Sequence, residues 1–129
     1  MAHEYHYDKE MDLVYIRWMD NVDYMDVYET LMQFNYPMPE HGHRIVLDFN
    51  SIKSSQLMSD DLMRLATLVK QYIGEKLAGA KIALLTTNSK WKLRARFYIA
   101  CRRLLSKNAP EYGVFGDTDT ALIWVHSKN

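Results

Sequence analysis

Two short apolar runs set the strongest limit on how this chain can fold. RIVLDF (44–49) and AKIALLTT (80–87) are each flanked by segments in which apolar residues recur every three or four positions. Strands that are apolar on both sides of the backbone are typical of parallel sheets covered by helices. Strands that alternate with helices in this way predict an α/β domain.

The other segments complete this order of strands and helices. EYHYD and LVYIRWM, separated by the polar turn KEMD, predict an antiparallel hairpin at the start of the chain. Helical spacing and capping residues predict helices at 24–34, 59–73, 90–107 and 117–125, and GVF predicts a brief strand at 113–115. The chain has 129 residues, the length of one typical domain. We therefore predict a single domain (1–129) with a five-stranded mixed, mostly parallel sheet and four helices in the order ββαβαβαβα.

Composition indicates a folded domain. Apolar residues make up 48% of the chain and charged residues 25%, which is ordinary for a globular protein and excludes a disordered or collagen-like chain. No apolar run approaches the length of a membrane span, and the first residues do not have the pattern of a signal peptide. The single cysteine, Cys101, cannot form an internal disulfide, so we expect a cytoplasmic protein.

The succession of these pieces resembles the STAS-like family of the anti-sigma-factor-antagonist type, in the branch with STAS/SEC14 domains. The residues that carry the resemblance are the buried strand ending in Asp48, Ala95 and Arg96 in the third predicted helix, and the closing strand with its acidic turn and ALIWV helix. The resemblance extends from about Tyr5 to Val125, nearly the whole chain. It implies a STAS-like fold and a non-enzymatic binding module.

The resemblance also directs attention to three serines. In signalling members of the family, the buried strand leads to a serine that is phosphorylated at the start of the next helix; Ser54, Ser55 and Ser59 are the counterparts here. Free backbone N–H groups and the helix dipole stabilise a phosphate at such a position. However, Ser54 and Ser55 lack the family's flanking Asp and Gly, and two aspartates follow Ser59. The alternative interpretation is a helix-capping serine and two loop hydroxyls.

The third predicted helix is strongly basic. The stretch KWKLRARFYIACRRLLSK (90–107) has seven basic side chains and no acidic one, although the formal net charge of the chain is zero. On a helical wheel, the basic stripe of Lys92, Arg96, Arg103 and Lys107 lies opposite an apolar arc of Trp91, Leu93, Phe97, Tyr98, Ala100, Cys101, Leu104 and Leu105. We expect the arc to pack in the core and the stripe to be solvated.

Two residues of this helix do not fit a simple division into core and surface. Arg94 falls within the apolar arc, and Trp91 lies at its edge near the start of the helix. An arginine in that position can extend its charged end to water, pair with a carboxylate, or bind an anionic ligand at the mouth of a cleft.

Charge is distributed unevenly along the chain. Residues 1–48 contain 3 basic and 10 acidic side chains, whereas residues 90–129 contain 8 basic and 3 acidic ones. This asymmetry favours an acidic protein partner, or the acidic N-terminal part of a second subunit, as the partner of the basic helix. Specific nucleic-acid binding is not expected, because the chain as a whole is neutral and contains no recognised reading module.

The sequence predicts no metal site, cofactor or catalytic residue. His41 and His43 in HGH, and His3 with His6, lie near neither a cysteine pair nor a carboxylate cluster that would complete a metal site. Cys101 falls on the apolar arc, where a buried thiol is expected. The chain has no phosphate-binding glycine loop or nucleophilic serine turn.

Two functions therefore remain open. The first is a non-enzymatic binding module, a homodimer that acts through protein contacts of the second and third helices. The second is a carrier or sensor of a small apolar or amphipathic, lipid-like ligand between helices and sheet, near Trp91, Arg94 and the methionines Met25, Met32, Met38, Met58 and Met63. The likeness to SEC14-type lipid carriers implies this second function.

Overall fold

Strands and helices alternate along the chain in the computed structural model, which describes residues 3–32, 44–72, 77, 79–107 and 109–127. Within these residues there are five strands and four helices, in the predicted order. They are β1 (His3–Asp8), β2 (Leu13–Val22), α1 (Tyr24–Met32), β3 (Arg44–Ser55), α2 (Ser59–Tyr72), β4 (Lys81–Leu85), α3 (Ser89–Leu105), β5 (Glu111–Phe115) and α4 (Thr118–His126).

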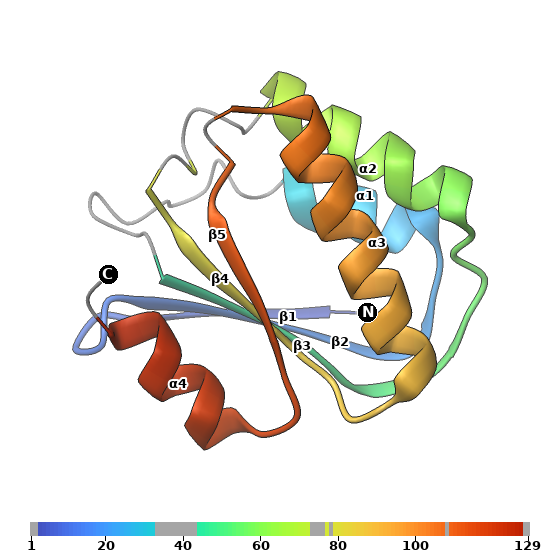
Figure 1. The fold of residues 1–129 in the computed structure, drawn as a ribbon. Helices are drawn as coiled ribbons and strands as arrows, with labels where there is room; N and C mark the ends of the chain where they lie inside the picture. Colours follow the sequence, from blue (N-terminus) through green and yellow to red (C-terminus); the bar gives the residue numbers. More distant parts are fainter. Residues whose placement is uncertain (1–2, 33–43, 73–76, 78, 108, 128–129) are drawn as a thin grey trace.

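The five described strands form one sheet in the order β1-β2-β3-β4-β5 (Figure 1). β1 and β2 are an antiparallel hairpin, and the other neighbouring strands are parallel. The prediction of a mixed, mostly parallel sheet is confirmed. The two apolar runs that predicted the fold are the central strands β3 and β4, and every residue of β4 is buried.

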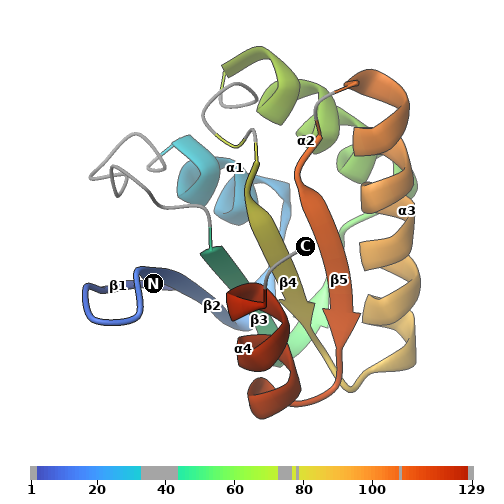
Figure 2. The same ribbon diagram turned by 60° about the vertical axis from the view of Figure 1, so that its left-hand side comes forward.

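Helices cover both faces of this sheet, three on one side and one on the other (Figures 1 and 2). α1, α2 and α3 lie over one face and enclose the larger apolar cluster, which includes Val14, Ile16, Trp18, Ile45, Leu65, Val69, Ile82, Leu84, Trp91, Ala95 and Ile99. α4 covers the other face, where Ala121 and Val125 pack on Leu13, Val46, Ala83 and Leu85. Alternation of side chains along each strand delivers apolar residues to both faces.

Several element boundaries differ from the prediction, among them those of β3 and α3. β3 was expected to end at Phe49, but it continues to Ser55 because β2 extends to Val22 and pairs with it along that length. α3 begins at Ser89, after Asn88, whose side-chain oxygen accepts hydrogen bonds from the backbone N–H groups at the helix start. The helix ends at Leu105, so Lys107 lies beyond it.

Asp48 is a buried carboxylate in the middle of the sheet. It accepts a short hydrogen bond from the Tyr15 hydroxyl and one of 2.9 Å from the backbone N–H of Asn50, and it lies 3.6 Å from the Nε of Arg17. Burial and the neighbouring Asp48 carboxylate raise the pKa of Tyr15, so this tyrosine remains a protonated donor. These partners explain how β3 accommodates a charge in its buried segment.

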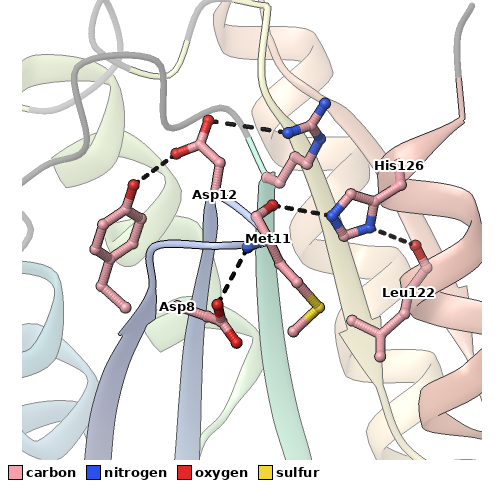
Figure 3. A network of polar contacts seen from close by, with 7 residues as sticks. Asp8, Met11, Asp12, Leu122 and His126 are labelled. Carbon is pink, nitrogen blue, oxygen red and sulfur yellow. Dashed lines mark hydrogen bonds and ion pairs between the residues drawn. The ribbon is translucent and has the colours of Figure 1, made fainter.

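The end of α4 is attached to the β1–β2 turn through His126 (Figure 3). Its Nε2 lies 3.0 Å from the carbonyl oxygen of Met11, and its Nδ1 lies 2.9 Å from the carbonyl oxygen of Leu122. In the same turn, Asp12 accepts a 2.8 Å hydrogen bond from the Tyr7 hydroxyl. Residues 115 positions apart in the sequence therefore meet at this end of the domain.

The start of α4 depends on a single capping carboxylate. Asp117 accepts hydrogen bonds from the backbone N–H of Thr120 at 2.8 Å and from its hydroxyl at 2.9 Å, and these bonds lower the pKa of Asp117. Because the folded state holds this pKa below its value in the unfolded chain, the stabilisation is present at neutral pH and is lost as pH falls through the folded pKa. We therefore expect Asp117→Ala to lower the melting temperature at pH 7 and to have progressively less effect in acid.

Thermal unfolding followed by circular dichroism from pH 7 down to pH 2 tests this expectation. Asp117→Asn is the matched control, because asparagine retains the capping acceptor but cannot titrate. A melting-temperature difference between wild type and Asp117→Ala that stays constant over this range contradicts the proposed role of the ionised carboxylate.

Candidate functional site

The outer face of α3 carries an exposed apolar stripe. Leu93 is 66% exposed, Phe97 36% and Leu104 87%, and the exposed Ala100 lies between them. We define these four residues as the α3 stripe. Successive members are four, three and four positions apart, so they follow one line along the helix.

This stripe corrects the predicted orientation of α3. The residues of α3 that are buried are Trp91, Ala95, Ile99, Cys101 and Arg102. The prediction that Leu93, Phe97, Ala100 and Leu104 pack in the core is therefore wrong. Apolar residues occur on both sides of this helix, and its periodicity alone does not decide which side contacts the sheet.

The predicted basic residues flank the α3 stripe on one side. Arg96 and Arg103 are exposed, and Lys107 is exposed beyond the end of the helix. Lys92, predicted to be solvated with them, is only partly exposed. α3 contains no acidic side chain. The surface of this helix therefore combines apolar groups with uncompensated positive charge.

Arg94 and Trp91 lie together at a small apolar cavity beneath the helices. The guanidinium of Arg94 is 5.0 Å from the centre of the Trp91 ring, a cation–π contact. Phe49 is stacked between Trp91 and Trp18, with ring centres 5.0 and 5.2 Å apart. The cavity has a volume of about 60 Å³ and is lined by Trp18, Val27, Leu31, Leu47, Phe49, Leu57, Leu62, Leu65, Leu84, Trp91, Arg94, Ala95 and Tyr98. The sequence pattern thus indicated two residues of this cavity, Trp91 and Arg94, but not the aromatic stack, whose members come from three separate elements.

The methionines do not line this cavity. Met25, Met58 and Met63 are exposed on or beside α1 and α2, Met32 is partly buried at the end of α1, and Met38 lies outside the described residues. The expectation that methionines surround an apolar pocket is therefore wrong for these three exposed residues. Met58 and Met63, together with the exposed Tyr72, instead give α2 apolar groups at its surface.

Arg102 is a buried cation that sequence analysis did not identify. It is 0% exposed; its Nε–H donates a 3.2 Å hydrogen bond to the Tyr112 hydroxyl, and neither terminal nitrogen has a hydrogen-bond partner among the described residues. Burial raises the pKa of the adjacent Tyr98 well above its ordinary value. The signal that could have found Arg102 is its place on the helical wheel, in line with Ala95 and Ile99.

The three candidate phosphorylation sites have different surroundings. The hydroxyl of Ser54 makes a short hydrogen bond to the side-chain oxygen of Asn21, and the Ser55 hydroxyl oxygen accepts one from the backbone N–H of Leu57 at 3.1 Å. Ser59 is the first residue of α2 and is exposed, with Asp60 and Asp61 directly after it. Ser54 and Ser55 therefore belong to the extended end of β3, and Ser59 is the serine placed at a helix N-terminus. Phosphorylation of these serines remains a prediction.

The described part of the chain contains no cluster of metal ligands. No group of three or more His, Cys, Asp or Glu side chains in those residues could hold a metal ion. His41 and His43 lie outside the described residues. Cys101 is a buried free thiol. Among the described helices, none is both long and apolar enough to cross a membrane.

Comparison with solved structures identifies the fold. The chain is similar to the crystal structure of an uncharacterized protein of the DUF3478 family with a SpoIIAA-like fold, from Shewanella loihica PV-4. The two share 13% sequence identity over 96% of this chain and 94% of that one, with a TM-score of 0.55. This chain has a SpoIIAA-like fold. The STAS-like fold implied by the sequence is confirmed; no protein-family model and no curated protein matches the chain.

Proposed function

We propose that this SpoIIAA-like protein is a non-enzymatic binding module that contacts a protein partner through α3 and the adjoining surface of α2. The observation that supports this proposal is the α3 stripe, whose two leucines are largely exposed. Exposed apolar groups in line on one helix, bordered by charge, are typical of an interaction surface. Met63 and Tyr72 are exposed on α2, where Met63 shares a hollow with Tyr24 of α1.

In the homodimer that the sequence predicts, the partner is a second copy of the chain. α3 has no acidic side chain with which to pair its cations, so a second copy would have to offer its acidic N-terminal part. α1 begins in that part, with Asp26 in its first turn. Sedimentation velocity of the purified protein at several concentrations distinguishes a dimer from a monomer that binds another protein.

Removing the apolar side chains of the stripe is expected to abolish partner capture. In a Leu93→Gln/Leu104→Gln variant, two leucines no longer gain burial on binding, a loss of about 3 kcal/mol or roughly a hundredfold in affinity. Both side chains are exposed and glutamine is a good helix former, so stability should change little. Immobilised wild type and variant are incubated with cell lysate, and the bound proteins are quantified by mass spectrometry.

Two controls distinguish loss of the stripe from general effects. Ile123→Gln removes an apolar side chain that is 73% exposed on α4, on the other face of the sheet. Arg96→Glu/Arg103→Glu reverses the charges beside the stripe, and Lys9→Glu/Lys53→Glu makes the same change of net charge away from α3. We expect both α3 variants to lose the same bound proteins and both controls to retain them. Identical capture by all five proteins contradicts the proposed function.

The cavity beneath the helices supports a second candidate function, the binding of a small apolar molecule. Its walls include the stacked rings of Trp18, Phe49 and Trp91, and Arg94 adds a cation for an anionic group. Typical ligand pockets have volumes of about 300–1,000 Å³. At about 60 Å³ the cavity does not accommodate a lipid-sized molecule unless the helices separate. This function therefore favours a small apolar anion over a lipid, and even an aromatic ring would require the cavity to open, since a cavity that binds benzene is about 150 Å³.

Native mass spectrometry of freshly purified protein tests ligand binding. An added mass that disappears on denaturation, and that is absent from a Trp91→Ala variant, supports a molecule in the cavity. Trp124→Ala, on the opposite face of the sheet, is the control and should retain the added mass. Spectra of wild type that show the bare chain only, together with no thermal shift from small aromatic carboxylates, contradict this candidate.

A further inference from the structure

The spacing of the α3 stripe matches the contact line between two packed helices. Apolar residues at intervals of four, three and four follow the 3.5-residue repeat by which one helix packs along another. From Leu93 to Leu104 the line spans 12 residues, about 16 Å at the rise of an α-helix. Building on the function proposed above, we propose that the α3 stripe binds an amphipathic helix of a partner protein, and that this helix carries acidic side chains beside its apolar face.

Charge along the flank of the stripe determines the acidic character of this partner. Arg96 and Arg103 are seven residues apart, so both lie on the same side of the stripe, and both are exposed. Positions that flank an apolar helix contact face the flanking positions of the other helix, where opposite charges select the partner. Since α3 has no acidic side chain, the partner helix supplies the carboxylates that face Arg96 and Arg103.

Pairing of α3 with α3 of a second copy is disfavoured by the same charges. In an antiparallel pair, the flank with Arg96 and Arg103 faces the identical flank of the other copy, so like charges oppose one another. In a parallel pair, this flank faces the side that carries Arg94 and Cys101, which offers no carboxylate either. The stripe therefore selects a different helix over α3 of a second copy.

An anionic membrane surface is also a poorer match than a helix. Membrane-surface helices use a broad apolar face with cations around it, whereas here the exposed apolar groups form a narrow line. A single line of this kind matches the contact between two helices better than the broad face of a membrane-surface helix.

A pair of designed peptides tests the proposal. Both are helical and about 21 residues long, with leucine along one line; one has glutamate at the flanking positions and the other lysine. Fluorescence anisotropy of the labelled peptides measures their affinity for the full chain. We expect wild type to bind the glutamate peptide at least tenfold more tightly than the lysine peptide.

Variants connect this preference to the α3 stripe. Leu93→Gln/Leu104→Gln should weaken binding of the glutamate peptide at least tenfold, and Arg96→Glu/Arg103→Glu should reverse the preference toward the lysine peptide. Ile123→Gln and Lys9→Glu/Lys53→Glu should bind both peptides as wild type does. Equal affinity of wild type for the two peptides, or a preference that Arg96→Glu/Arg103→Glu leaves unchanged, overturns the proposal.

Two further measurements distinguish the proposed helix from two other occupants of the stripe, a membrane and a second copy of the chain. The first is flotation with vesicles that contain equal amounts of phosphatidylglycerol and phosphatidylcholine. If wild type floats with these vesicles and Leu93→Gln/Leu104→Gln does not, the stripe binds a membrane and the proposal is overturned. The second is sedimentation velocity. If wild type is a dimer and Arg96→Glu/Arg103→Glu is a monomer, the stripe binds a second copy and the proposal is likewise overturned. If capture of proteins from lysate depends on the stripe but wild type binds both peptides equally, the proposal of an acidic partner helix is wrong. The proposal of a protein-binding module is then still supported.

Discussion

Replacing Trp18 with alanine is expected to lower the free energy of unfolding by about 3–5 kcal/mol, the range for removal of a large buried aromatic side chain. Trp18 is 1% exposed, stacks on Phe49 and donates a 3.2 Å hydrogen bond from its Nε1–H to the Thr30 hydroxyl. Its removal leaves Phe49 without one of its two stacking partners and Thr30 without its indole donor. Urea unfolding followed by far-ultraviolet circular dichroism measures the loss.

The position of Trp18 also predicts which other aromatic side chains the Trp18→Ala substitution disturbs. Phe49 carries the stack from β2 through β3 to Trp91 on α3, so the Trp18→Ala variant should lose near-ultraviolet circular dichroism from the remaining rings. Trp124→Ala is the control, because Trp124 is only partly buried and packs against α4's face of the sheet. If Trp124→Ala destabilises the protein as much as Trp18→Ala, the stack beneath α3 is not the main aromatic core.

Replacing Arg102 with methionine is expected to raise the free energy of unfolding by about 1–3 kcal/mol, because a buried charge without a carboxylate partner costs more than an apolar side chain of similar length. Arg102 is fully buried and its terminal nitrogens have no partner among the described residues. The Tyr112 hydroxyl, which accepts the Nε–H of Arg102, retains its contact with the Tyr98 hydroxyl. Methionine fills the space with flexible apolar atoms.

The neighbouring arginine provides the control for this prediction. Arg103 is exposed, so Arg103→Met should change the free energy of unfolding by no more than about 0.5 kcal/mol. Urea unfolding of both variants at pH 7 gives the comparison. A clear loss of stability in Arg102→Met would show that the guanidinium is paired in solution and contradict its description as an unpartnered charge.

Local patterns account for the parts of this fold that were predicted correctly. The apolar runs around Val46 and Ala83 are long enough for strands and too short for helices, and the polar turn before Leu13 favours a hairpin. Asp117 marks the start of α4 because a capping carboxylate acts on backbone groups within three residues of it. Each of these signals acts between residues close together in the chain, which is why sequence analysis can detect it.

The candidate site was predicted only in part. Arg96 and Arg103 are exposed as expected, and Trp91 lies beside Arg94 as their spacing allowed. The α3 stripe was placed in the core, because a helix with apolar residues on both sides can turn either side toward a sheet. Which side is buried depends on the shape of the surface that receives it.

The sequence by itself determined the order of strands and helices and the two-sided burial of the central strands, because both follow from periodicity and from contacts between near neighbours. Tertiary structure alone decided the rest: the joining of Trp18, Phe49 and Trp91 into one stack, the burial of Arg102, and the exposure of the α3 stripe. These features depend on packing between elements distant in the chain. Trp91 stacks on Phe49 in the core and turns the side of α3 with Ala95 and Ile99 inward, so Leu93 and Leu104 remain at the surface.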